Sequence, residues 1–203
     1  MEESTKKIRI ACVGDSITFG YGIKEKEQYS YPAQLQNLLG EKYEIGNFGT
    51  NHATVFKNGS KLYWNMVSFQ KAKTFSPSIV IIIFGANCSN KTNWKNQENY
   101  ESNILGLIQE FQNLTTSPEI IVCLPPPAFH KKFGVRPLII ENEIIPKLQI
   151  VIAQNNLTTI DLHTPLKKNK DFFTDAIHPD RNGAKIIADT IYNYVRNTTL
   201  SRI

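Results

Sequence analysis

Apolar residues along the chain gather in short runs of strand length, at residues 8–13, 43–48, 79–84, 120–124 and 157–162. The runs are continuous rather than alternating, which is typical of strands that are covered on both faces of a parallel sheet. Segments with helical spacing lie between and after them, at residues 31–39, 62–75, 100–114, 139–154 and 183–195. This alternation predicts an α/β fold, a three-layer α/β/α sandwich whose parallel strands are joined by right-handed crossovers.

Size and composition favour one domain. The chain has 203 residues, of which 41% are apolar, and this is enough for one sizeable core but short for two. We therefore expect a single domain over residues 1–203. The triple proline at 125–127 follows the fourth run too closely to be a linker, and it predicts a stiff loop instead.

Charge and cysteine content exclude several classes of protein. The formal net charge is +5, but the lysines are scattered, so we expect no nucleic-acid partner. The cysteines are odd in number, which argues against a disulfide framework: Cys12, Cys88 and Cys123. No apolar stretch approaches the roughly 20 residues of a membrane helix, and the first residues lack a signal-peptide pattern. We expect a soluble protein, although an exported one without its signal would look the same.

Chemically suggestive residues follow the predicted strands. Ser16 comes after the first run, Gly49 after the second and Asn87 after the third, and the pair Asp175 and His178 comes after the fifth. In open α/β sheets, ligands bind outside the carboxyl ends of the strands. We therefore expect these side chains to meet at one edge of the sheet.

Ser16 is the candidate nucleophile. A serine hydroxyl needs a base within hydrogen-bond reach and an exposed position on a tight turn. Gly14 relieves crowding where the strand turns, and a position at a helix N-terminus would leave the Ser16 N–H free to face an oxyanion. The alternative is that Asp15 or Ser16 only caps a helix.

His178 is the candidate base. A neutral imidazole can accept the serine proton near neutral pH and return it to the leaving group. Asp175 can accept the proton on the other ring nitrogen and hold the tautomer. The alternative makes Asp175 a helix N-cap and His178 an ordinary loop residue. We interpret the remaining histidines, which lack such a carboxylate, as surface or structural residues: His52, His130 and His163.

An acyl-transfer site also needs hydrogen-bond donors for the oxyanion. Gly49 offers a backbone N–H without a side chain to block the substrate, and Asn87 offers an amide. With the Ser16 N–H, they would form the oxyanion hole. Taken alone, each is also an ordinary turn residue.

Together these residues resemble the SGNH or GDSL-type hydrolases, whose four motif blocks contain a serine, a glycine, an asparagine and a histidine. The matching positions follow in the same order: Gly14-Asp15-Ser16-Ile17, Gly49, Gly85-Ala86-Asn87 and Asp175-Ala176-Ile177-His178. The resemblance implies a flavodoxin-like, five-stranded parallel sheet in the order 2-1-3-4-5. It also implies ester hydrolysis without metal or cofactor, with Ser16 as nucleophile, His178 as base and Asp175 as its orienting partner.

Two positions depart from the family pattern. Ile17 replaces a leucine of similar volume, which should be tolerated. Cys88 stands where the family commonly has an aspartate after the oxyanion asparagine. If that aspartate holds the loop, Asn87 would be less rigidly aimed, and loss of a well-placed donor costs about 3 kcal/mol of transition-state stabilisation. A catalytically weakened glycan-binding protein is therefore one hypothesis.

The substrate class is predicted from less specific features of the sequence. Residues 30–33 and Trp94 resemble bacterial carbohydrate acetylesterases that act on sialate or plant polysaccharide, and the absence of a long apolar lid favours small acyl groups. Trp94 and Tyr100 would form a wall on which a sugar stacks, or would only anchor their loop to the core. We expect an O-acetylesterase that acts on small-molecule or glycan esters, with a lysophospholipase or thioesterase as the alternative.

Overall fold

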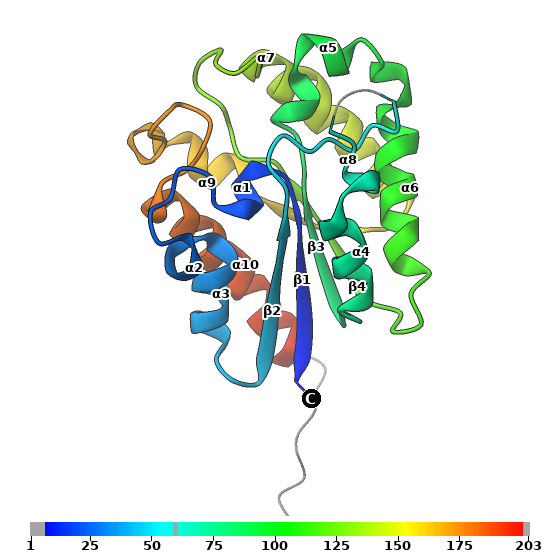
Figure 1. The fold of residues 1–203 in the computed structure, drawn as a ribbon, viewed down its shortest axis with the longest axis vertical. Coiled ribbons are helices and arrows are strands. Elements are labelled where there is room, and N and C mark those ends of the chain that lie inside the picture. The colour runs from blue at the N-terminus through cyan, green and yellow to red at the C-terminus, as the bar shows by residue number, and fades with distance from the viewer. Residues whose placement is uncertain (1–6, 59–60, 201–203) are drawn as a thin grey trace, which may run out of the picture.

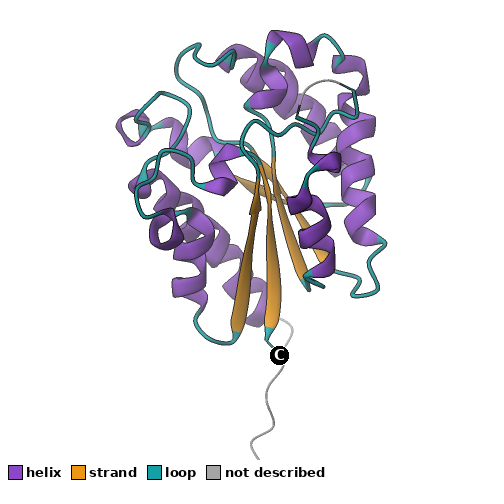
Figure 2. Ribbon diagram, in the orientation of Figure 1, coloured by secondary structure: helices purple, strands orange, loops and turns teal. Residues whose placement is uncertain are grey.

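A computed structural model of the protein describes residues 7–58 and 61–200. It contains a five-stranded parallel sheet in the order β2-β1-β3-β4-β5, with helices on both faces (Figure 2). The strands are β1 (Ile8–Gly14), β2 (Tyr43–Gly49), β3 (Ile79–Ile83), β4 (Glu119–Leu124) and β5 (Thr158–Asp161). The expected α/β fold and strand order are confirmed.

Both faces of the central strand β1 are buried beneath helices. Successive side chains of a strand point to opposite faces of the sheet. On β1, Ile10 and Cys12 belong to one apolar core, while Ala11 and Val13 belong to the other. All four are fully buried. The central position of β1 therefore explains why it reads as a continuous apolar run in the sequence.

The longer helices form the two outer layers (Figure 1). The Ile10 face of the sheet is covered by α3 (Tyr31–Leu39), α9 (His163–Lys167) and α10 (Arg181–Leu200). The Ala11 face is covered by α4 (Val67–Thr74), α6 (Tyr100–Gln112) and α8 (Ile145–Gln154). The described residues also form short α-helices of about one turn: α1 (Ser16–Phe19), α2 (Lys26–Tyr29), α5 (Lys91–Trp94) and α7 (Pro137–Ile139).

Two of the expected helices are interrupted. The 62–75 segment enters α4 only in its second half, because Met66 is extended with φ −87° and ψ 146°. The 139–154 segment contains a π-helical stretch, Ile140–Ile144, directly before α8. Pro146 lies in the first turn of α8 and has no N–H to donate, which accounts for the change in hydrogen-bond pattern there.

The carboxyl ends of the strands carry the loops that hold the predicted site, with α1 at the end of β1 (Figure 1). Pro125 follows β4 and packs against Gly85 after β3, where a Cβ atom would lie 2.6 Å from the proline ring. That glycine therefore permits the two loops to approach. Within the described ranges, no helix combines the length and the apolar character that crossing a bilayer needs.

Candidate active site

Ser16 lies where β1 turns into α1. Gly14, the last residue of β1, has no room for a side chain, since a Cβ atom would lie 2.2 Å from Thr18 Oγ1. The Asp15 carboxylate accepts the Ile17 N–H at 3.0 Å and caps α1. Ser16 is therefore not needed as a cap, and it is the first residue of the helix, with its side chain in the pocket described below.

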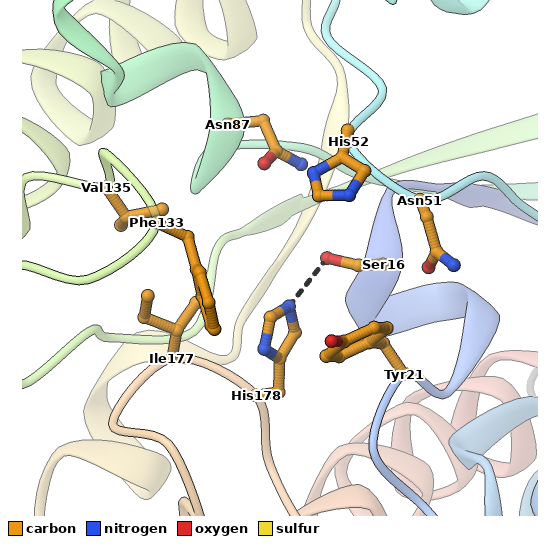
Figure 3. A pocket seen from close by; sticks show the side chains of 9 residues that line it. All are labelled: Ser16, Tyr21, Asn51, His52, Asn87, Phe133, Val135, Ile177 and His178. Carbon is orange, nitrogen blue, oxygen red and sulfur yellow. Dashed lines mark hydrogen bonds between the residues drawn. The ribbon is translucent and has the colours of Figure 1, made fainter.

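Three side chains from the two ends of the chain form a hydrogen-bonded series. Ser16 Oγ lies 2.9 Å from His178 Nε2 (Figure 3), and His178 Nδ1 lies 2.6 Å from Asp175 Oδ2. A neutral imidazole with its proton on Nδ1 donates to Asp175 and leaves Nε2 to accept the serine hydroxyl. The structure thus brings the predicted nucleophile, base and orienting carboxylate together.

A tight turn shapes the Asp175–His178 pair. Ala176 has a left-handed backbone with φ 70°, and Asp175 Oδ1 accepts the N–H groups of Ile177 and His178 at 3.0 and 2.7 Å. Burial acts to raise the pKa of Asp175, but these N–H groups and the His178 ring outweigh it, so the pKa lies below its ordinary value. Asp180, rather than Asp175, caps α10 by accepting two backbone N–H groups of its first turn.

Ser16 and His178 open into a pocket of about 70 Å³. The residues that line it are Ser16, Tyr21, Asn51, His52, Asn87, Phe133, Val135, Ile177 and His178 (Figure 3). Figure 3 shows Asn87 and His52 across Ser16 from His178. The volume is far below the roughly 300–1,000 Å³ that is common for ligand pockets, so this pocket has room for a small group only.

Asn87 reaches the pocket from the turn after β3. Its Nδ2 lies 3.4 Å from Asp15 Oδ2 and 3.3 Å from the Ala53 carbonyl oxygen, longer than the roughly 2.7–3.2 Å of ordinary N–H···O bonds. The amide is therefore oriented but weakly engaged. The Asn93 side chain supports the backbone by donating to the Asn87 carbonyl oxygen at 2.9 Å.

A second carboxylate, Asp15, directly precedes Ser16 in the chain and is 1% exposed. Burial raises its pKa from 3.8 to about 7, and the hydrogen bonds from the Ile17 N–H and the Asn87 amide offset only part of this effect. Asp15 therefore titrates close to neutral pH. It links the cap of α1 to the orientation of Asn87.

The family model of the GDSL-like lipases/acylhydrolases matches residues 12–186 of this chain. This range contains the serine turn, the Asn87 turn and the Asp175–His178 turn. The chain belongs to the GDSL-like lipase/acylhydrolase family. This is the family that the sequence motifs resemble.

Individual relatives agree with this assignment. An acetylxylan esterase from Xylanibacter ruminicola is 34% identical over 202 residues, which cover 91% of this chain and 42% of that protein. The chain thus spans about two fifths of the length of this relative. A lipase/acylhydrolase from Enterococcus faecalis shares the fold, with a TM-score of 0.72 and 23% identity over 94% of this chain and 96% of that one. A carbohydrate acetylesterase from Sinorhizobium meliloti does so with a TM-score of 0.72 and 15% identity, over 95% and 100%.

Gly49 of this GDSL domain does not reach the pocket, in contrast to the expectation. It ends β2 beside Gly14, and its N–H donates to Asn47 Oδ1 at 3.0 Å. A Cβ atom on Gly49 would lie 2.1 Å from the Phe19 nitrogen, so this glycine lets β2 approach α1. Its N–H is already bonded and is not available to an oxyanion.

His52 occupies the place beside Ser16 that we expected for Gly49. The Ala53 N–H donates to the Thr50 carbonyl oxygen at 3.2 Å, and within this turn His52 has φ 65° and lines the pocket. In the described part of the chain, no acceptor is bonded to the His52 N–H. Its closeness to Gly49 in sequence was the only signal for it, and interpreting it as a surface or structural residue missed its position in the pocket.

Trp94 and Tyr100 are core residues of the GDSL domain rather than a sugar-binding wall. They are 3% and 0% exposed, and their ring centroids lie 5.4 Å apart and 6.3 and 6.1 Å from that of Phe56. Neither lines the pocket. Their aromatic surface is used in packing, so they anchor their loop to the core, and the aromatic side chains at the pocket are Tyr21 and Phe133.

Cys88 lies in a loop that has other supports. The side chain is fully buried, and burial raises the pKa of its thiol to about 12. Ser89 Oγ donates to the Ala86 carbonyl oxygen at 2.7 Å and accepts the Arg136 N–H at 2.9 Å. These contacts hold the loop where the family commonly has an aspartate. The other cysteines are likewise buried with free thiols: Cys12 and Cys123.

The other histidines lie outside the pocket. His163 Nδ1 lies 3.2 Å from the Pro125 carbonyl oxygen after β4, and His130 is exposed. Among the described residues, no group of three or more His, Cys, Asp or Glu side chains is placed to hold a metal ion.

Proposed function

We propose that this GDSL domain hydrolyses short-chain acyl esters, with O-acetyl groups on carbohydrate as the substrate class, through an acyl-enzyme on Ser16. The observation that carries the proposal is the hydrogen-bonded series from Ser16 through His178 to Asp175 at a pocket of about 70 Å³. The Oγ to Nε2 distance of 2.9 Å is within the range for proton transfer. The 34% identical acetylxylan esterase supports the carbohydrate part.

In the acylation step, Ser16 Oγ attacks the carbonyl carbon of the ester while its proton passes to His178 Nε2. Asp175 stabilises the imidazolium that forms, because its carboxylate lies 2.6 Å from Nδ1. The bond from the carbonyl carbon to the alcohol oxygen then breaks, and His178 gives its proton to that oxygen. The alcohol leaves, and the acyl group stays on Ser16.

The tetrahedral intermediate carries a negative oxygen that needs donors. We assign this role to the Ser16 N–H, the Asn87 amide and the His52 N–H. The Ser16 N–H is at the first position of α1, where no intrahelical acceptor exists. His52 takes the role predicted for Gly49, because its N–H is unbonded beside the pocket while that of Gly49 is bonded.

Deacylation uses the same groups with water in place of the alcohol. His178 takes a proton from water as the water oxygen bonds to the acyl carbon. The bond to Ser16 Oγ breaks, and the imidazolium returns the proton to the serine. One ester and one water become one carboxylic acid and one alcohol, and the enzyme is restored.

The size of the pocket favours a short acyl group. An acetyl group fits a volume of about 70 Å³, whereas a long fatty acyl chain needs a cavity of the size that is common for larger ligands. The same observation disfavours a lysophospholipase or a long-chain thioesterase. The supports around Cys88 disfavour the weakened binding protein, because the backbone of the loop that carries Asn87 is held without the aspartate.

The proposal is tested with p-nitrophenyl acetate, butyrate and octanoate, using wild type and Ser16→Ala. We expect the highest turnover on acetate and a kcat at least ~10⁴-fold lower in the variant, with an unchanged circular dichroism spectrum and Tm. Turnover that persists in Ser16→Ala would refute the nucleophile. A maximum at octanoate would move the function to lipid or long-chain thioester substrates. Glycan binding without turnover, with Ser16 not labelled by a fluorophosphonate, would favour the binding protein.

A further inference from the structure

The walls beside His178 are aromatic. The ring centroids of Tyr21 and Phe133 lie 4.6 and 6.3 Å from that of His178, and Figure 3 shows them on opposite sides of the imidazole. Tyr21 is 41% exposed and Phe133 is 57% exposed. Most large apolar side chains in the described part of the chain are buried, so two exposed rings at one pocket suggest a binding surface.

Phe133 is held at the pocket by an unfavourable turn. The Val135 N–H donates to the Lys132 carbonyl oxygen at 2.9 Å, and both central residues are left-handed, Phe133 with φ 50° and Gly134 with φ 79°. Turns with two positive φ values favour Asn or Asp followed by Gly, because a bulky residue is unfavourable there. An aromatic residue at such a position indicates a function for its ring.

This turn is anchored to the loop that carries Asn87. The Arg136 N–H donates to Ser89 Oγ at 2.9 Å. Gly134 packs closely on Asn90, since a Cβ atom would lie 2.0 Å from the Asn90 Nδ2. The aromatic ring at the tip of the turn therefore has a defined position relative to the oxyanion donor.

Tyr21 is set in place by α1. Gly20 ends the helix with φ 85°, and the Tyr21 N–H donates to the Ser16 carbonyl oxygen at 2.9 Å. The nucleophile and this second ring thus belong to one tight turn.

The mechanism determines which part of the substrate these rings border. His178 returns its proton to the leaving oxygen, so the alcohol part of the ester lies against His178. The carbonyl oxygen of the ester lies toward the oxyanion donors, the Asn87 amide and the His52 N–H. Because Tyr21 and Phe133 flank His178, they border the alcohol part.

We propose that Tyr21 and Phe133 form a sugar clamp, two exposed aromatic side chains on either side of His178 whose solvent-facing parts contact the sugar whose hydroxyl carries the acetyl group. The inference rests on the proposed function, and it assigns sugar recognition to these residues instead of Trp94 and Tyr100. Aromatic faces suit the apolar C–H faces of a pyranose, and their exposed area contributes to binding without new charges.

The first test compares two substrates. For each protein, kcat/KM on acetylated xylo-oligosaccharide is divided by kcat/KM on ethyl acetate, which has no ring. We expect this ratio to fall about five- to tenfold in Phe133→Asn and in Tyr21→Ala, the size of one lost stacking contact. Asparagine suits the turn at position 133, so the fall cannot be ascribed to a misfolded turn. Phe133→Tyr should keep the ratio, and so should Val67→Ala, which alters a 69% exposed apolar residue outside the pocket.

The second test measures binding without chemistry. Xylotetraose is titrated into Ser16→Ala and into Ser16→Ala/Phe133→Asn, followed by NMR, and we expect binding that is about five- to tenfold weaker in the second protein. A ratio within twofold of wild type in both clamp variants would overturn the clamp, and so would equal or absent xylotetraose binding. Binding that depends on Phe133, with no Ser16-dependent turnover, would refute the esterase and retain the clamp.

Discussion

Two carboxylates lie on either side of the Ser16–His178 contact, and their surroundings shift their pKa values in opposite directions. Each accepts a backbone N–H from two residues ahead, Ile17 for Asp15 and Ile177 for Asp175, both at 3.0 Å. At Asp175, hydrogen bonds outweigh burial and the pKa falls. At Asp15, burial outweighs the hydrogen bonds and the pKa rises to about 7.

The difference teaches that a local turn does not by itself set the charge of its carboxylate. Asp175 keeps some contact with solvent, with 16% of its side chain exposed, and it is bonded by two N–H groups and an imidazole. It is an anion at neutral pH, suited to stabilise His178 when that ring is charged. Asp15 lacks solvent, so it serves as a buried support for Asn87 and α1.

The largest expected effect comes from breaking the Asp175 side of this comparison. Asp175→Asn can still accept the backbone N–H groups of its turn, so the fold should persist, but the amide cannot hold the imidazole in the required tautomer. We expect kcat on p-nitrophenyl acetate to fall by ~10³–10⁴-fold with a small change in KM. Steady-state kinetics measure the fall in kcat, and a thermal melt checks that the fold persists. A loss of less than tenfold in kcat would contradict the role of Asp175.

The Asp15 side is tested by the pH dependence of stability. Its folded pKa of about 7 lies above the ordinary value of 3.8, so the folded protein binds more protons between these values. The free energy of unfolding therefore falls as pH rises from about 4 to 7. At about 1.4 kcal/mol per pKa unit, Asp15 should contribute a decrease of about 2–4 kcal/mol. Asp175 acts in the opposite direction, because its lowered pKa adds stability above about pH 4 that is lost on acidification.

Urea unfolding of wild type and Asp15→Asn at pH 4.5 and pH 7.5 isolates this contribution. The asparagine can still accept the Ile17 N–H but does not titrate. Wild type should lose stability relative to the variant between the two pH values. A difference between the two proteins that is the same at both pH values would show that Asp15 does not titrate in this range.

A third carboxylate can be added next to Asp15 by substituting Cys88. Cys88 is fully buried and close enough to Asp15 for the two charges to interact, so Cys88→Asp places an acid in an apolar site that already holds one. We expect a loss of about 2–3 kcal/mol in the free energy of unfolding and no gain in kcat/KM, since other contacts hold the loop. Cys88→Ala is the matched control and should cost less. Higher activity in Cys88→Asp would mean that the loop does need an aspartate.

The smallest effect is expected at His52, which lines the pocket and has a left-handed backbone with φ 65°. A left-handed backbone costs a non-glycine residue roughly 1–2 kcal/mol, and glycine loses about 0.5–1 kcal/mol more than alanine through chain entropy. His52→Gly should therefore be about 0.5–1 kcal/mol more stable than His52→Ala, which keeps the strain. Urea unfolding of both variants measures the difference, and equal stability would show that the turn is not strained.

Much of the fold could be predicted from the sequence, because strands and helices are indicated by patterns of neighbouring residues. The strands of a sheet buried on both faces are continuous apolar runs, and the run at 8–13 differs from β1 by one residue. The helix expected over 31–39 coincides with α3. Pro146 is also visible in the sequence, but the π-helical stretch that precedes it was not predicted, because helical spacing alone does not distinguish the two hydrogen-bond patterns.

The hydrogen-bonded series from Ser16 through His178 to Asp175 could be predicted for a chemical reason. Ser16, Asp175 and His178 follow strand ends in a sheet whose carboxyl ends must share an edge, and each turn is shaped by hydrogen bonds within a few residues. Neither turn, however, encodes the 2.9 Å contact between Ser16 and His178, which joins positions 162 residues apart.

The sequence by itself determined the layers, the strand order through the family motifs, and which residues we propose as the reacting groups. Only the tertiary structure decided that His52 rather than Gly49 presents a free N–H, and that Tyr21 and Phe133 rather than Trp94 and Tyr100 border the pocket. The physical reason is that the hydrophobic effect is non-directional, so an apolar residue in the sequence does not reveal which surface it will pack against. An aromatic residue is equally apolar in a core or at a rim, and the direction of an N–H depends on what distant segments pack against it.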